Sequence, residues 1–171
     1  MNKSKSFLAF AGAAALSLAS TFSQAEDSRP LSFLDRKPDV WLNAGFLSYH
    51  FDTDKHYRDF NYGVGAEAMF SANHGLMAGR YKNSESEWSN YVGYEYRPFH
   101  WQPSFVNGAD VFAGFAVSLM DGYPSMNNKG WFIAPFPFVG IEGKTVGANF
   151  IFVPNIKHGA AIAMQLKLKV W

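Results

Sequence analysis

The sequence predicts an all-β fold: an eight-stranded, antiparallel, up-and-down transmembrane β-barrel. Three observations lead to this prediction. About eight segments show period-two alternation of side-chain character and are bounded by Gly, Asn, Asp, Ser or Pro. Aromatic residues form 18% of the chain and charged residues 17%, against about 25% charged in an average soluble domain. The chain ends on Trp171, and a terminal aromatic residue is typical of chains inserted by the barrel-assembly machinery of the bacterial outer membrane.

The first 25 residues have the layout of a cleavable secretory signal peptide. Lys3 and Lys5 form a basic start, residues 7–19 are apolar and rich in alanine, and small residues precede the expected cleavage after Ala25. Removing 25 of the 171 residues leaves 146, enough for one domain. Residues 26–38 form a lead-in, whose short amphipathic stretch 31–34 either lies on the inner rim or is disordered. We expect the barrel to comprise residues 39–171.

Composition excludes several classes of protein. The chain has no cysteine, which excludes a disulfide-stapled module, a thiolate metal site and a lipoprotein anchor. Loss of the two signal-peptide lysines changes the formal net charge from +1 to −1, and this near-neutral balance argues against nucleic-acid binding. We expect neither a metal nor a cofactor.

The lengths of the apolar stretches indicate how the chain crosses the bilayer. After the signal peptide, the longest uncharged windows span about a dozen residues, such as 145–156. A spanning helix needs roughly 20 apolar residues, whereas a spanning strand needs about 10. Because lipid satisfies no backbone polar group, spanning strands must close into a barrel.

The predicted strands follow one another along the whole mature chain. They are residues 39–52, 60–71, 75–83, 88–97, 108–120, 131–140, 144–153 and 159–171. The alternation is clearest in the second, where Tyr62 and Val64 belong to a lipid-facing row and Asn61, Gly63 and Glu67 to a lumen-facing row.

The connections between these strands alternate in length. Residues 72–74 and 141–143 form short turns, while 53–59, 84–87 and 121–130 form longer polar loops. With the N-terminus in the periplasm, the longer loops lie outside the cell. Segment 98–107 does not fit this alternation of short and long connections, because it is long for a periplasmic turn.

The last strand leaves two registers open. Leu166, Leu168 and Val170 share one face, whereas Lys167 and Lys169 share the face of Trp171. A slip of one residue exchanges the lipid and lumen faces, so the alternation alone does not assign them.

Two features of the predicted outer half bear on chemistry. His50 ends the first strand and Ser84 lies in a rim loop, and a histidine near a hydroxyl is the minimum for general-base catalysis. Pro135 and Pro137 interrupt the sixth strand and mark either a bend or a lateral opening for an acyl chain. The rim acids, which are Asp52, Asp54, Glu85 and Glu87, are either solvated loop charges or contacts to lipopolysaccharide through divalent cations.

Two stretches resemble the lipid A palmitoyltransferase (PagP) family of eight-stranded outer-membrane enzymes. Residues 75–84 with 91–98 look like that family's strand, hairpin and strand with Lys-Asp-Ser at its tip, and residues 131–140 with 146–154 look like its proline-interrupted strand and the next one. The family uses a rim histidine, aspartate and serine. By this resemblance Ser84 matches the serine and Asn83 stands in place of the aspartate.

The histidine of the family has two candidate positions in this chain. His50 lies at the end of the first strand, but an alignment on Trp41 and Phe46 puts Asn43 there instead. Strict alternation gives His50 the face of Phe46, so we expect it to point inward only if a β-bulge intervenes.

The resemblance implies an acyltransferase in the bacterial outer membrane that moves a palmitoyl chain from a phospholipid to lipid A. His50 would be the base, Asn83 and Ser84 would position the scissile ester, and a lumen of small and apolar groups would hold the acyl chain. The alternative is a non-enzymatic, lipid-binding or structural small barrel. Solute transport is disfavoured, because side chains fill an eight-stranded lumen.

Overall fold

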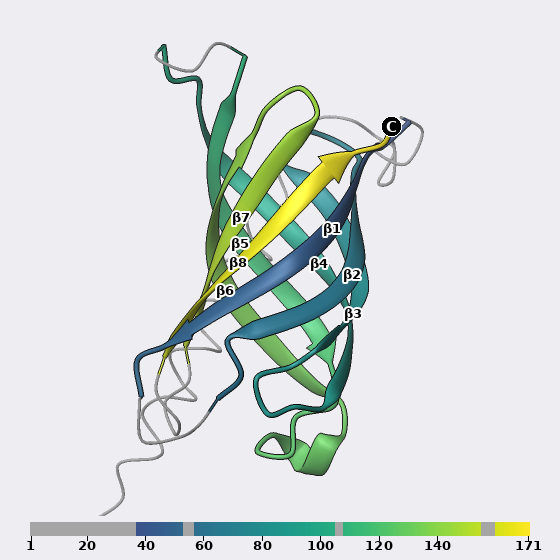
Figure 1. Ribbon diagram of the computed structural model, residues 1–171. Helices are drawn as coiled ribbons and strands as arrows, with labels where there is room; N and C mark the ends of the chain where they lie inside the picture. Colours follow the sequence, from purple (N-terminus) through teal and green to yellow (C-terminus); the bar gives the residue numbers. More distant parts are fainter. Residues whose placement is uncertain (1–36, 53–56, 105–107, 155–159) are drawn as a thin grey trace, which may run out of the picture. The chain divides into compact units, whose positions relative to one another are not determined.

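The computed structural model describes residues 37–52, 57–104, 108–154 and 160–171, which form a closed barrel of eight strands (Figure 1). The strands are β1 (Asp39–His50), β2 (Phe60–Met69), β3 (His74–Lys82), β4 (Trp88–Trp101), β5 (Asp110–Met120), β6 (Phe132–Glu142), β7 (Val146–Val153) and β8 (Ala161–Lys169). The expected signal peptide and the lead-in up to residue 36 lie outside the described residues. Within the described ranges, no helix is long and apolar enough to cross a bilayer.

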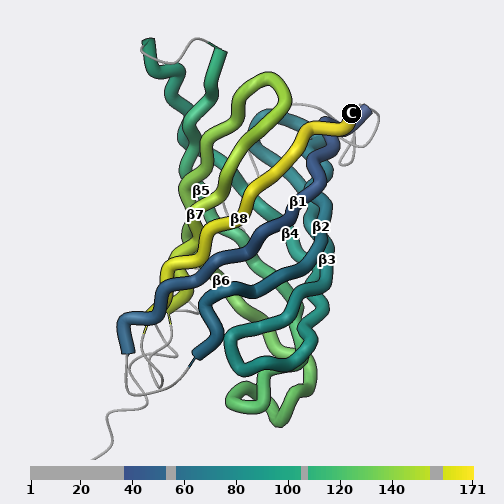
Figure 2. Tube along the Cα trace, viewed as in Figure 1, coloured from purple at the N-terminus to yellow at the C-terminus, as the bar shows by residue number. Residues whose placement is uncertain are grey.

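Each strand pairs antiparallel with its sequence neighbours, and β1 closes the barrel by pairing with β8. Figure 2 shows the resulting up-and-down path, in which the first and last strands lie side by side. The predicted fold is confirmed. Each strand lies where the alternation predicts it, with ends that differ by up to a few residues.

The largest difference concerns β4, which continues to Trp101 instead of ending at Arg97. The β4–β5 ladder shifts register between Tyr96 and Phe99, so Pro98 lies at a bulge within the strand. This extension takes up part of segment 98–107, which explains the excess length of that predicted turn.

The two faces of the strands differ as expected for a barrel in lipid. On β2, Asn61 and Glu67 are buried inside, whereas Tyr62 and Val64 point outward and are 41% and 61% exposed. The structure also resolves the register of the last strand, because Lys167 is buried inside while Leu166 and Leu168 are exposed outside. An apolar outer wall around polar or small inward residues is the orientation that a bilayer requires.

The two ends of the barrel carry different connections. We call the end with the first residues of β1 and the last of β8 the inner end, and the opposite one the outer end. The inner end carries the turns at 70–73 and 143–145, and the outer end carries the loop 121–131 with its short 3-10 helix η3 (Asn127–Lys129). In Figure 1 the C-terminus and η3 accordingly lie at opposite ends.

A bulge in β1 sets the direction of its last residues. Gly45 has φ +66°, a left-handed conformation that favours glycine, and the ladder with β2 shifts register between Ala44 and Phe46. Asn43 therefore faces inward before the bulge, and Phe46 and His50 face inward after it. The bulge that an inward His50 requires is present.

Side chains fill the lumen in two layers. In the outer half, Phe46, Tyr91 and Met120 form a buried apolar cluster. In the inner half, charged residues such as Glu67 and Arg97 are almost completely buried. The expectation of a lumen lined by small and apolar groups was therefore wrong for the inner half, where opposite charges from different strands compensate one another across the barrel.

Candidate functional site

Three loops meet at the outer rim and are tied together by hydrogen bonds. The backbone N–H of Arg58, in the β1–β2 loop, donates to the carbonyl of Ser84, in the β3–β4 loop, at 2.9 Å. The β3–β4 loop in turn contacts the β5–β6 loop through Glu85, whose carboxylate accepts hydrogen bonds from Ser125, and through the ion pair of Glu87 with Lys129 at 2.9 Å. The described parts of these loops thus form one connected structure.

His50 lies at the end of β1 with its ring turned into the rim. The imidazole stacks on Tyr57 at a centroid distance of 4.4 Å, and its Nδ1 lies 3.7 Å from a carboxylate oxygen of Asp59. This nitrogen is buried and makes no hydrogen bond to another described residue. The ring is therefore held between Tyr57 and Asp59, with Nδ1 closed off from solvent.

Asn83 is fully buried, and its amide is completely used. The Nδ2 group donates to Ser89 Oγ and to the carbonyl of Gly122, both at 2.9 Å. The Oδ1 atom accepts from the backbone N–H of Glu85 at 3.0 Å and of Glu87 at 2.9 Å. Because an amide offers two donors and one doubly accepting oxygen, no site is left for a substrate. Asn83 therefore shapes the β3–β4 loop and positions Ser84.

Ser84 is held next to this amide, at the outer mouth of the barrel. Its side chain lies near the phenol of Tyr123, which is 2.8 Å from that of Tyr81. Burial raises the pKa of Tyr123 to about 12, so the phenol is protonated at neutral pH. Among the described residues no hydrogen bond joins Ser84 to His50, although both belong to the connected rim.

Asn43, the other position for the family's histidine, lies away from the rim. It is 1% exposed, and its Nδ2 donates to Glu67 Oε1 at 2.8 Å in the inner layer of the lumen. Of the two positions, His50 alone shares the rim with Ser84.

Among the described residues, β6 has no strand partner on one side over part of its length. All of β6 pairs with β5, but only Phe138–Glu142 pairs with β7. Pro135 and Pro137 belong to the stretch without a β7 partner, and both are exposed on the outer wall. Proline within a sheet is confined to edges and bulges, and this stretch of β6 is an edge on the β7 side.

An apolar groove of about 230 Å³ lies on the outer wall at the point where this pairing ends. The exposed side chains that line it are Phe99, Phe115, Pro137, Val139, Phe150 and Phe152. Lipid tails in contact with this wall therefore reach the edge of β6.

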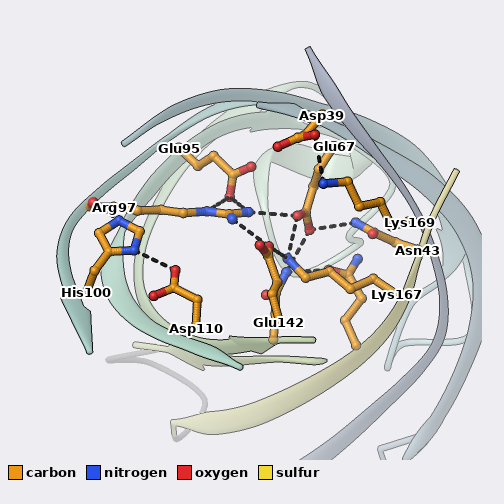
Figure 3. A network of polar contacts seen from close by, with 12 residues as sticks. Asp39, Asn43, Glu67, Glu95, Arg97, His100, Asp110, Glu142, Lys167 and Lys169 are labelled. Carbon is orange, nitrogen blue, oxygen red and sulfur yellow. Dashed lines mark hydrogen bonds and ion pairs between the residues drawn. The ribbon is translucent and has the colours of Figure 1, made fainter. Parts of the chain in front are cut away.

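The inner layer is a network of five charged side chains from four strands, β2, β4, β6 and β8 (Figure 3). Arg97 donates to Glu67 at 2.8 Å, to Glu95 at 3.1 Å and to Glu142 at 2.6 Å. Lys167 Nζ lies 2.8 Å from Glu67 and 2.6 Å from Glu142. We refer to these five residues as the lumen charge network. It contains three carboxylates and two cations, and it blocks the inner half of the lumen.

The sequence-based site did not include this network. The period-two alternation could have indicated it, because Glu95 and Arg97 on β4 and Lys167 on β8 all occupy positions whose side chains point into the lumen. Their mutual contacts depend on the stagger of strands that are far apart in sequence, and the alternation within each strand carries no information on it.

The sequence left two interpretations of the acids at the outer rim: solvated loop charges, or contacts to lipopolysaccharide through divalent cations. Glu85 and Glu87 have protein partners, Ser125 and Lys129, and Asp54 lies outside the described residues. In the described part of the chain, no group of three or more His, Cys, Asp and Glu side chains is arranged to hold a metal ion. The two glutamates therefore join loops.

A closed antiparallel ladder with an apolar outer wall and a filled interior that is polar in its inner half defines a transmembrane β-barrel. No protein-family model and no curated protein matches the sequence. Solved structures that are similar include a de novo designed transmembrane β-barrel, with 16% identity over 79% of this chain and 98% of the design, at a TM-score of 0.49.

Two natural barrels are also similar. The N-terminal β-barrel domain of OprF from Pseudomonas aeruginosa matches with 11% identity over 79% of this chain and all of that domain, at a TM-score of 0.40. Neisserial surface protein A matches with 9% identity over 78% of this chain and 96% of its own, at a TM-score of 0.35.

Proposed function

We propose that the protein is a bacterial outer-membrane acyltransferase, which moves a fatty acyl chain from a phospholipid to lipid A. One observation carries the proposal. The bulge at Gly45 turns His50 into the same rim that holds Ser84, and among the described residues β6 has an unpaired edge in this outer half. A base, a hydroxyl and a route for lipid therefore occur in the same half of the barrel.

The unpaired edge supports entry of the acyl chain from the bilayer. The inward residues of that stretch, Phe132, Ala134 and Phe136, pack against the buried cluster that contains Phe46 of β1. An acyl chain that leaves the outer groove past Pro137 reaches the strand of His50 only by displacing these apolar side chains, which fill the outer half of the lumen. It stops above the lumen charge network, so the acyl chain is held in the outer half and not along the whole barrel.

The chemical step needs no co-reactant. His50 takes the proton of an attacking lipid A hydroxyl, and the hydroxyl oxygen forms a bond to the ester carbonyl carbon of the phospholipid. The bond from that carbon to the glycerol oxygen breaks, and the proton passes from His50 to this oxygen. Ser84 hydrogen-bonds the ester, while Asn83 positions Ser84. The products are an acylated lipid A and a lysophospholipid.

Purified protein in vesicles tests this proposal directly. The vesicles contain lipid A and a phospholipid that is labelled in its acyl chain, and mass spectrometry follows the label. We expect transfer by the wild type and a loss of roughly 10²–10⁴ in rate for His50→Ala, the usual effect of removing a general base. His74→Ala is the control, because His74 lies at the inner end of β3. No labelled lipid A with a folded wild-type barrel would refute the proposal.

The filled lumen favours a second candidate, the non-enzymatic lipid-binding or structural barrel. Phe46, Tyr91 and Met120 are each 8% exposed and occupy the place where an acyl chain would have to enter. If these side chains do not move, lipid binds only in the outer groove. The labelled-lipid experiment separates the two candidates, because a structural barrel binds the phospholipid and leaves its ester intact.

A further inference from the structure

We propose that the outer wall carries a binding site for the phosphate group of an outer-leaflet lipid, formed by Arg58, Arg80 and Lys82 around the rings of Tyr62 and Trp88. We call these five residues the cation–aromatic patch. The proposal concerns binding only, and it holds whether or not the protein transfers acyl chains.

The patch is compact, and its rings hold the cations in place. Tyr62 and Trp88 contact each other edge to face at a centroid distance of 5.7 Å. The Arg58 guanidinium lies 4.8 Å from the Tyr62 ring centre, the Arg80 guanidinium 4.8 Å from that of Trp88, and Lys82 Nζ 5.7 Å from that of Trp88. Three positive charges therefore converge on two touching rings.

Within the described part of the chain the cations of the patch are only weakly compensated, since Lys82 interacts with Glu87 electrostatically without forming a salt bridge. Among the residues that the structure describes, none of the three forms a salt bridge, and the nearby Glu87 is paired with Lys129. Arg58 is oriented by the hydrogen bond from its Nε to the carbonyl of Phe60, at 2.6 Å. Like charges held this close repel one another, so a bound anion stabilises the arrangement.

The position of the patch identifies the anion. Arg80 and Lys82 occupy the lipid-facing row of β3 near its outer end, above Leu76, which is 47% exposed on the same row. Aromatic residues with cations above an apolar band mark the level of lipid headgroups. The anions at this level are lipid phosphates, which guanidinium groups bind through paired hydrogen bonds.

The test measures lipid binding by the folded barrel in phosphatidylcholine nanodiscs. The probes are diphosphorylated lipid A and the same lipid after enzymatic removal of its phosphates, and native mass spectrometry counts the molecules retained. We expect the wild type to prefer the phosphorylated probe by about tenfold, and Arg80→Gln/Lys82→Gln to lose this preference. Lys37→Gln/Lys144→Gln is the matched control, since it removes two exposed cations at the inner end of the barrel.

Two further measurements show whether the preference for phosphorylated lipid A comes from direct contact between the cations and the phosphate. Direct contact between cations and phosphate survives chelation of divalent ions by EDTA and weakens with added salt. Lys82→Gln alone, which leaves both arginines in place, is expected to reduce the preference partly and keeps the test open if the double variant does not fold. An unchanged preference in a folded patch variant, an equal loss in the control, or a loss in EDTA would each overturn the proposal. Failure of acyl transfer would leave it intact.

Discussion

Replacing Lys167 with methionine tests whether the lumen charge network stabilises the barrel. Methionine keeps the unbranched shape of the side chain and is shorter by one atom, so the substitution mainly removes the charged ammonium group. Lys167 is 4% exposed and contacts Glu67 at 2.8 Å and Glu142 at 2.6 Å. Without it, three carboxylates face Arg97 alone, and the formal charge of the network changes from −1 to −2.

The magnitude follows from these contacts. An ion pair about 4 Å apart is worth about 4 kcal/mol at an effective dielectric constant of ~20. Breaking a buried pair by removing one partner costs about 3–5 kcal/mol, because the other charge stays buried without compensation. We therefore expect Lys167→Met to lower the free energy of unfolding by about 3–5 kcal/mol.

The assay is urea unfolding of the barrel in phospholipid vesicles, followed by tryptophan fluorescence and by gel migration without heating. Lys167→Met/Glu142→Gln removes one charge of each sign, so it should cost about 2 kcal/mol less than the sum of the single variants. A loss below about 1 kcal/mol for Lys167→Met, or strict additivity in the double variant, would refute the network as a stabilising unit.

The remaining predictions concern the rim and the wall. Asn83→Asp should destabilise the barrel by about 1–3 kcal/mol in the same unfolding assay, because a carboxylate cannot donate to the carbonyl of Gly122; unchanged stability would contradict the role given to this amide. Replacing Pro135 and Pro137 together by alanine should slow acyl transfer from labelled phospholipid in a barrel that still folds, and an unchanged rate would exclude a gate. Planar-bilayer recordings should show no stable conductance, since the lumen charge network blocks the inner half, and a steady ionic channel would disprove this.

The barrel itself could be predicted because its signal is local. Each strand alternates between lipid and lumen with a period of two, so Tyr62 and Val64 could be placed outside and Glu67 inside from the sequence of one strand. The register of the last strand could not be chosen, because both faces of 164–171 contain residues that a lipid or a lumen accepts. The structure settles it through the burial of Lys167.

The parts that could not be predicted depend on pairing between strands. The sequence marks Pro135 and Pro137 as unusual, but it does not show at which residue β7 stops pairing with β6. Alternation continues along β7 beyond that residue, because β7 still pairs with β8 as far as Val153. Likewise, Gly45 is one of 15 glycines in the chain, and its bulge becomes visible only in the ladders with β2 and β8.

Asn83 shows a limit of the prediction that relied on the family resemblance. The resemblance to the palmitoyltransferase family identifies its position relative to Ser84, and this placed it among the residues that handle the ester. Its four hydrogen bonds give it the role of organising the loop instead. An amide in place of the family's aspartate changes both the chemistry at this position and the hydrogen bonds that shape the loop. The sequence does not separate these two effects, whereas the hydrogen bonds of Asn83 do.

The central claim, acyl transfer to lipid A by a rim that contains His50, is tested most directly in cells. Lipid A is extracted from a strain that carries the gene, from a deletion strain, and from deletion strains complemented with the wild type or with His50→Ala, and its acyl chains are counted by mass spectrometry. We predict a lipid A species with one additional acyl chain in the strain with the gene and in the wild-type complement, and its absence from the other two. Identical lipid A in all four strains, with the barrel present in the outer membrane, would contradict the claim and leave the non-enzymatic barrel as the function.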